Sequence, residues 1–181
     1  MKNVDWNSLR DRAYKISCDH GFHEEKASKK EIKTYLMLII TEVSEAVEAD
    51  RKCRHADTEF FNRKYKDCSD TRFGYERTIM GSVEEELADI IIRCLDAAGA
   101  YNLDIDYSTG KYTFAIDGKS FVENAFSLSD ILINLYFESA LKNTINYVLD
   151  WCEYLDIDIM AHIELKMKYN ETRPYKNGKK Y

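Results

Sequence analysis

The sequence contains very little proline and glycine. Its 181 residues include one proline, Pro174, and seven glycines. Because both residue types interrupt helices, their scarcity beside abundant Leu, Ile, Glu, Lys and Ala is typical of an all-α protein. The length suits one domain with a sizeable core. We therefore expect residues 1–181 to form a single all-α domain, a bundle of four to six helices.

Other absences exclude classes of function. The five cysteines are odd in number and form no Cys-x-x-Cys pair, which argues against zinc and favours reduced thiols in the cytoplasm. No signal peptide is visible, and no apolar run approaches the ~18 residues of a membrane span. The formal net charge of −6 argues against a nucleic-acid polymer as partner. We expect a soluble cytoplasmic protein.

Two short acidic runs are the most informative feature that is present. Glu42 and Glu45, like Glu86 and Asp89, lie three residues apart on strongly helical stretches, so each pair shares a helix face. At about 100° per residue, both pairs lie at the edge of an apolar stripe rather than opposite it. Carboxylates at the margin of a core repel one another and lose solvation. A hard divalent cation with oxygen ligands would compensate for both costs.

Other interpretations of the acids remain open beside this one. A solvated stripe with an Asp89–Arg93 ion pair would explain a single acidic pair, but two pairs beside two apolar stripes make the metal interpretation equally good. Iron is a second possible occupant, but di-iron helical bundles use Glu-x-x-His, which does not occur in this sequence. An oxygen-only site favours Mg²⁺, with Mn²⁺ as the other candidate.

A basic cluster lies near the end of the sequence. Lys166, Asn170 and Arg173 follow i, i+4, i+7 spacing and so share one helical face. These residues could simply complement the negative end of a helix. They could also form a phosphate clamp, in which Lys and Arg supply charge and Asn a hydrogen bond. Magnesium held by carboxylates, with a separate basic clamp, is how proteins bind polyphosphates.

Apolar periodicity and capping signals predict the remaining organisation. A polar excursion at 53–81 separates the two acidic helices, and loops of that length are usually functional or mobile. Alternating, β-branched and aromatic residues with two glycines predict a small β-hairpin at 105–124. We expect helices at 5–19, from a capping box at 28–31 to about Lys52, at 59–65, and from a capping box at 82–85 to about Tyr101. A further helix starts at 127 and is either broken near Phe137 or continuous to Trp151, and the last runs from 156–158 to just before Pro174.

Three segments carry a family resemblance: LIITEVSEAVEADRK, EELADIIIRCLDAAG and IELKMKYNETRPYKNGKKY. In this order they resemble the MazG-like all-α nucleoside triphosphate pyrophosphohydrolases, a superfamily that includes the dimeric dUTPases and dCTPase-type enzymes. Its signature, ExxE on one helix and ExxD on the next, matches the two acidic runs. The chain departs from it in three ways: Thr41 stands where many relatives have Glu, forty residues separate Glu45 from Glu86, and about 106–155 has no counterpart.

The resemblance implies a MazG-like bundle that hydrolyses a nucleoside triphosphate between the α- and β-phosphates, giving a monophosphate and pyrophosphate, as a homodimer or homotetramer. The chemistry is metal-assisted phosphoryl transfer, with one glutamate accepting the proton of the attacking water. A non-catalytic nucleotide-binding regulatory module on the same bundle is the alternative, and a helical interaction protein the third. The implied roles are metal ligation by Glu42, Glu45, Glu86 and Asp89, proton acceptance by Glu45 or Glu86, phosphate binding by Lys166, Asn170 and Arg173 with Arg51 and Lys52 as weaker candidates, an auxiliary role for Asp96, and base contact by Phe22 and His23.

Overall fold

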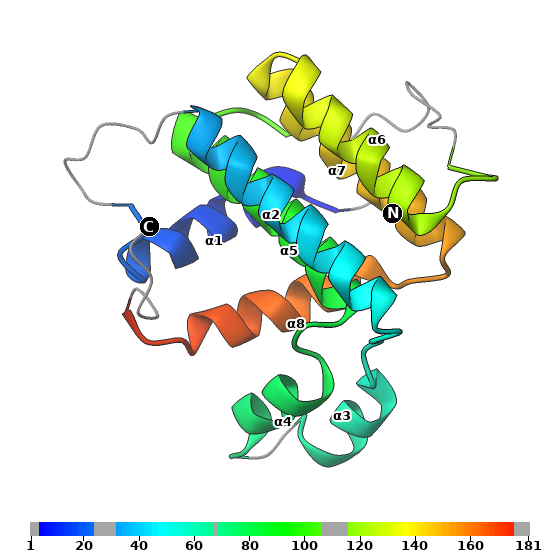
Figure 1. Ribbon diagram of the computed structural model, residues 1–181. Coiled ribbons are helices and arrows are strands. Elements are labelled where there is room, and N and C mark those ends of the chain that lie inside the picture. Colours follow the sequence, from blue (N-terminus) through cyan, green and yellow to red (C-terminus); the bar gives the residue numbers. More distant parts are fainter. Residues whose placement is uncertain (1–3, 24–31, 67–68, 106–115, 176–181) are drawn as a thin grey trace.

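The computed structural model describes residues 4–23, 32–66, 69–105 and 116–175, and within them the chain is entirely helical, without a strand. This confirms the predicted all-α class. α2 and α5 lie side by side at the centre, α6 and α7 cover one side, α1 lies on the other, and α8 crosses below (Figure 1). The helices are α1 (Trp6–Asp19), α2 (Ile32–Arg51), α3 (Thr58–Lys64), α4 (Thr71–Thr78), α5 (Val83–Tyr101), α6 (Phe121–Asn134), α7 (Phe137–Tyr154) and α8 (Ile159–Glu171).

α5 is the centre of the fold. Thirteen of its nineteen residues are buried, as expected for a helix surrounded by other helices. It packs against α1, α2, α7 and α8. α1 approaches closely because Gly99 has no side chain: a Cβ there would lie 2.5 Å from the Cβ of Tyr14. Polar side chains on α5 therefore lie at the edges of helix–helix contacts, where they meet groups from neighbouring helices.

The start of α5 departs from its predicted capping box. Ser82 is the N-cap, and its side chain accepts a hydrogen bond from the Glu85 backbone N–H at 3.2 Å, as predicted. The reciprocal bond is absent, because the Glu85 carboxylate accepts from the Gly81 N–H instead. Ser82 N–H donates to the carbonyl of Ile79. Glu85 is therefore free to face α8. The other predicted capping box, at 28–31, lies outside the described residues.

The helical pair α6–α7 corrects two predictions. The predicted hairpin lies partly outside the described residues, at 106–115, but its last residues, 121–124, open α6 rather than a strand. α6 begins at a true capping box between Ser120 and Glu123, six residues before the predicted start. The aromatic residue Phe121 contributed to the strand prediction. In the structure it packs against Trp151 of α7, with ring centroids 4.5 Å apart. Of the two forms that the sequence left open for this segment, the one broken near Phe137 is observed, since α6 ends at Asn134 and α7 begins at Phe137.

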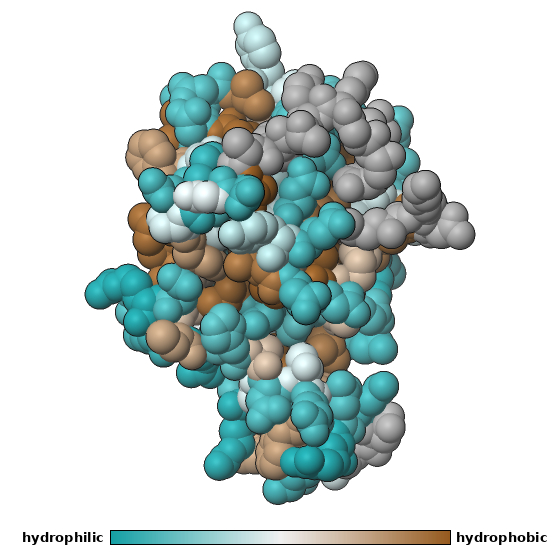
Figure 2. All heavy atoms as spheres, turned by 90° about the vertical axis from the view of Figure 1, so that its right-hand side faces the viewer, coloured by the Kyte–Doolittle hydropathy of each residue, from teal (hydrophilic) through white to brown (hydrophobic). Residues whose placement is uncertain are grey.

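The excursion at 53–81 is a helical hairpin with its own small core. α3 confirms the predicted short helix, whereas α4 was not predicted. The hairpin projects from the main body below α8, and its visible surface is mostly hydrophilic (Figures 1 and 2). Its core joins the main body through α8, because Tyr75 stacks on Tyr169 with centroids 4.4 Å apart and an 11° interplanar angle.

Two further features fix the end of α1 and the course of α8. Arg12 of α1 contacts Glu164 at 2.5 Å and Glu171 at 2.9 Å on α8. α1 ends at Asp19, and Gly21 follows with φ of 75°, a left-handed conformation that glycine adopts without strain. That turn brings Phe22 back toward the helix bundle. Among the described residues, none of the helices combines the length and apolarity that crossing a membrane requires.

Candidate metal centre

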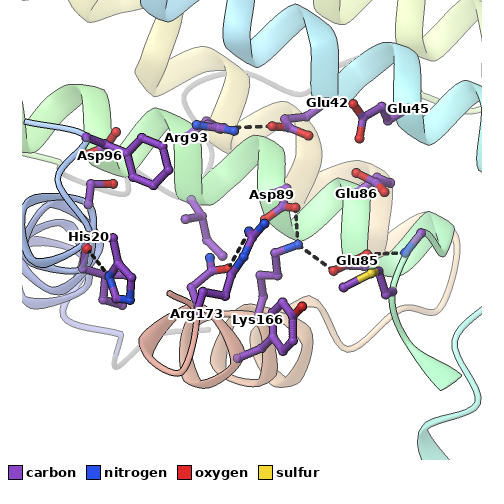
Figure 3. A pocket seen from close by; sticks show the side chains of 18 residues that line it. His20, Glu42, Glu45, Glu85, Glu86, Asp89, Arg93, Asp96, Lys166 and Arg173 are labelled. Carbon is purple, nitrogen blue, oxygen red and sulfur yellow. Dashed lines mark hydrogen bonds and ion pairs between the residues drawn. The ribbon is translucent and has the colours of Figure 1, made fainter. Parts of the chain in front are cut away.

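Three carboxylates from the two predicted acidic runs converge between α2 and α5. Glu42, Glu86 and Asp89 each offer an oxygen, and these oxygens all lie within 4.8 Å of one another. Glu42 and Glu86 are buried, and Asp89 is half-buried. Glu45, the fourth predicted ligand, is exposed and lines the same pocket outside this cluster of three. Figure 3 shows Glu42 and Glu45 on α2 facing Glu86 and Asp89 on α5.

Glu86 bears the electrostatic cost of this arrangement. Its side chain faces the pocket although the residue is only 6% exposed. Burial raises the pKa of Glu86 from its usual 4.5 to about 8, and the charges of Asp89 and Glu85 add to the shift. Among the described residues, no side chain donates a hydrogen bond to its carboxylate or pairs with it. Burial and the neighbouring acids therefore favour the protonated form of Glu86.

Glu42 is oriented by Arg93. The Arg93 Nε donates to Glu42 Oε1 at 2.8 Å across the contact between α5 and α2. Burial raises the pKa of Glu42, followed by repulsion from Asp89, and Arg93 opposes both effects. One interpretation of the sequence pairs Arg93 with Asp89, but the observed ion pair of Arg93 is with Glu42 on another helix. One oxygen of Glu42 thus remains available to the cluster.

Lys166 of α8 occupies the opposite side of the cluster. Its Nζ lies 2.6 Å from Asp89 Oδ2 and 2.5 Å from Glu85 Oε1. Burial disfavours the ammonium charge, but Asp89 and Glu85 raise the pKa of Lys166 above its usual value, so it is charged. In this structure Lys166, predicted as a phosphate ligand, is bound to acids.

Glu85 connects this pair to the α3–α4 hairpin. The residue is 2% exposed, and its carboxylate accepts from the Tyr75 hydroxyl at 2.9 Å as well as from Lys166 and the Gly81 N–H. Burial and the charge of Glu85 raise the pKa of Tyr75, so its hydroxyl is a permanent donor. A buried carboxylate with three donors is fully compensated.

A pocket of about 350 Å³ lies over these groups, between α1, α2, α5 and α8 (Figure 3). Asn170 and Arg173 line it on the same side as Lys166, and the Arg173 guanidinium lies over the Tyr169 ring, 5.6 Å from its centroid. Hence the acidic side of the pocket faces a basic and polar side. The predicted site residues that line it are Phe22, Glu42, Glu45, Glu86, Asp89, Asp96, Lys166, Asn170 and Arg173.

The remaining predicted residues lie elsewhere. His23 contacts Asp96, with Nε2 2.7 Å from Oδ1, and does not line the cavity itself. Asp96 is consequently engaged by a histidine and lies outside the cluster of three carboxylates. Arg51 and Lys52 pair with Glu48 at 2.8 and 3.0 Å in the last turn of α2, away from the pocket lining.

Sequence reasoning missed the groups that reach the site across long sequence separations. The sequence assigns Glu85 only to the capping box at 82–85, although three consecutive glutamates exceed what a helix start needs. Tyr75 lies in the excursion at 53–81 and gave no periodic signal. His20, Met80 and Tyr169 also line the pocket. The run Glu84-Glu85-Glu86 was the local signal that could have indicated a role for Glu85 in the site.

The donor set fits a hard divalent cation. Three carboxylate oxygens within 4.8 Å of one another can approach one ion, and the buried Glu86 forms no ion pair within the described residues. Among the described residues, no cysteine or histidine belongs to the cluster, so its ligands differ from those typical of zinc and di-iron sites. Comparison with protein-family models, curated proteins and solved structures gives no match. The resemblance to the MazG-like enzymes therefore stays a prediction, and the chemistry of the pocket rests on its own geometry.

Proposed function

We propose that this protein is a Mg²⁺-dependent nucleoside triphosphate pyrophosphohydrolase that cleaves between the α- and β-phosphates. One observation carries the proposal: a single pocket has converging carboxylates of Glu42, Glu86 and Asp89 on one side and Asn170 and Arg173 on the other. A metal bound by carboxylates opposite a basic clamp suits a polyphosphate, whose charge needs compensation from both sides. The motif order seen in the sequence supports the same assignment.

The residues around the pocket have different roles in this reaction. Glu42, Glu86 and Asp89 hold the cation, and Arg93 keeps Glu42 turned toward it. When bound, Mg²⁺ neutralises phosphate charge and makes a water nucleophilic at neutral pH. Mn²⁺ satisfies the same ligands. Asn170 and Arg173 bind the phosphate chain, and Glu45, which is exposed at the pocket, accepts a proton from water.

The end of the pocket next to α1 suits the nucleoside. Phe22 and Ile16 offer apolar surface there, and Asp96 offers a carboxylate that His23 holds in place. An aromatic ring beside a fixed hydrogen-bond acceptor is a common way to bind a base or a ribose. His23 then acts through Asp96 rather than by direct contact.

A product screen tests the proposal. The purified protein is incubated with Mg²⁺ and each canonical, deoxy and modified nucleoside triphosphate, and the products are separated by chromatography. We expect a monophosphate and pyrophosphate from at least one of them, and loss of both products in Asp89→Asn. Glu48→Gln, at a half-buried acid on α2 outside the pocket lining, is the matched control and keeps full turnover. Normal turnover of Asp89→Asn would show that the assigned site is wrong.

A non-catalytic nucleotide-binding module is the second candidate, and a specific observation favours it. Arg93 and Lys166 already compensate Glu42 and Asp89, so the pocket is electrostatically tolerable without a metal. The two functions differ in one outcome of the screen. Thermal stabilisation by a nucleotide without product formation supports the module, whereas product formation supports the enzyme.

Assembly as a homodimer or homotetramer is part of the proposal, because a few helices rarely enclose a triphosphate alone. Light scattering after size-exclusion chromatography measures it directly. A mass twice or four times that of the 21.2 kDa chain supports the assembly, and a monomer that is fully active contradicts it.

A further inference from the structure

Lys166 lines the pocket, but its observed partners conflict with the role implied by its position. It lies on the same face of α8 as Asn170, and both line the pocket, which predicts contact with an anion. Its ammonium instead contacts two carboxylates, Glu85 and Asp89. One of them, Asp89, also belongs to the cluster of three that fits a metal. Lys166 and a bound metal ion would therefore compete for the Asp89 carboxylate.

The geometry makes joint occupancy of Asp89 unfavourable. Lys166 Nζ lies 2.6 Å from Asp89 Oδ2, and a divalent cation would lie about 2.1 Å from an oxygen of the same carboxylate. Two such positive charges come within a few ångströms of each other in a partly buried site, where screening by water is weak. Binding of the metal thus weakens the Lys166–Asp89 pair directly.

Metal binding does not weaken the contact between Lys166 and Glu85 in the same way. Glu85 is not part of the cluster of three, and the Tyr75 hydroxyl and Gly81 N–H hold its carboxylate in place. Tyr75 also stacks on Tyr169, three residues after Lys166 on α8. The lysine ammonium has three donors on a flexible side chain, so it can keep one hydrogen bond to Glu85 while another donor changes partner. The planar guanidinium of arginine has a more rigid donor geometry.

Resting on the function proposed above, we propose that Lys166 is an exchangeable cation. Without metal its ammonium compensates Asp89. When a divalent cation takes Asp89, Lys166 stays on Glu85 and turns its freed donor to an anion beside Asn170 and Arg173. Lys166 thereby couples metal binding to phosphate binding, and Glu85 and Tyr75 are positioning residues for it.

Calorimetric titration of Mg²⁺ alone tests the exchange without any turnover. Because Lys166→Met removes the competing charge, we expect it to tighten Mg²⁺ binding by about tenfold, within the usual range of coupling between sites. The double variant Glu85→Gln/Lys166→Met removes the buried Lys166–Glu85 pair together, so that only the half-buried Asp89 loses its cation, and we expect the same tightening in a folded protein. Lys168→Met removes an exposed charge from the same helix and leaves Mg²⁺ affinity within about twofold.

A second titration tests the anion half, with inorganic tripolyphosphate added at saturating Mg²⁺. Lys166→Met weakens its binding by about tenfold, and Lys168→Met leaves it unchanged. Unchanged or weaker Mg²⁺ binding in both Lys166 variants, or unchanged tripolyphosphate binding, would overturn the exchange. If the unaltered protein binds Mg²⁺ and Glu86→Gln abolishes that binding, such a result removes only this inference. If the unaltered protein binds no Mg²⁺, the proposed function fails together with it.

Discussion

Glu85 and Glu86 are neighbours in sequence, and both are buried, yet they lie in opposite electrostatic surroundings. On the side toward α8, Glu85 accepts from Tyr75, Lys166 and the Gly81 backbone. On the side toward α2, Glu86 meets the acids Glu42 and Asp89, and among the described residues only the more distant charge of Lys166 favours its carboxylate, without an ion pair. One carboxylate is a structural anchor, and the other is suited to an incoming cation. The comparison shows that burial of an acid has a functional meaning only once its partners are known.

Replacing Glu86 should have the largest effect on function. In Glu86→Gln the cluster loses one of three anionic ligands. We therefore expect Mg²⁺ affinity to fall by at least about 100-fold and the turnover rate to fall by about 1,000-fold. The fold remains intact, because the amide resembles the protonated carboxyl that burial already favours. Calorimetry and product formation measure the two effects. A variant that keeps normal Mg²⁺ affinity would remove Glu86 from the site.

Replacing Glu85 should have the largest effect on stability. Glu85→Gln leaves Lys166 with one carboxylate and the Tyr75 hydroxyl with a weaker acceptor, which we expect to lower the unfolding free energy by about 3 kcal/mol. Urea denaturation monitored by circular dichroism measures it. Glu45→Gln, an exposed acid at the same pocket, is the control and changes stability by less than about 0.5 kcal/mol. Equal effects of the two substitutions would mean that Glu85 is no anchor.

The pH dependence of stability and of Mg²⁺ binding should follow the protonation of Glu86. Its folded-state pKa of about 8 exceeds the usual 4.5, so the folded protein binds more protons between these values. Without metal, the unfolding free energy therefore falls as pH rises from about 4.5 to 8 through this group. Because metal must displace the proton, apparent Mg²⁺ affinity rises by about tenfold per pH unit up to about 8.

Calorimetry at pH 7 in buffers of different ionisation enthalpy measures the proton count. We expect release of about one proton for each Mg²⁺ bound. Binding without proton release would show that Glu86 is ionised before the metal arrives, and the contrast with Glu85 would then disappear.

Removing the Tyr75 hydroxyl should have the smallest effect. Tyr75→Phe deletes one of three donors to Glu85 and keeps the stacking on Tyr169, so we expect a loss of about 1 kcal/mol in the unfolding free energy. Tyr65→Phe in the same small core, tested by the same denaturation, gives the comparison for a hairpin tyrosine away from Glu85. A loss in Tyr75→Phe no larger than that in Tyr65→Phe would mean that the bond to Glu85 contributes no more than another hydroxyl of the hairpin.

Local sequence patterns predicted the acidic helices well, because periodicity and capping act within one element. The predicted faces of α2 and α5 do bring Glu42, Glu86 and Asp89 together, and Lys166, Asn170 and Arg173 do share one side of the pocket. The pairing of Lys166 with Glu85 and Asp89 could not be predicted, since it depends on where α8 crosses α5, 77 to 81 residues away in sequence. α4 was missed because it is short and has a glycine, Gly74, inside it.

The most direct test of the central claim is an anomalous difference map from crystals soaked in Mn²⁺. We predict one peak about 2.2 Å from oxygens of Glu42, Glu86 and Asp89, and none beside the Glu85 carboxylate. A peak at Glu85, or no peak at the cluster of three when Mn²⁺ is saturating, would contradict the account.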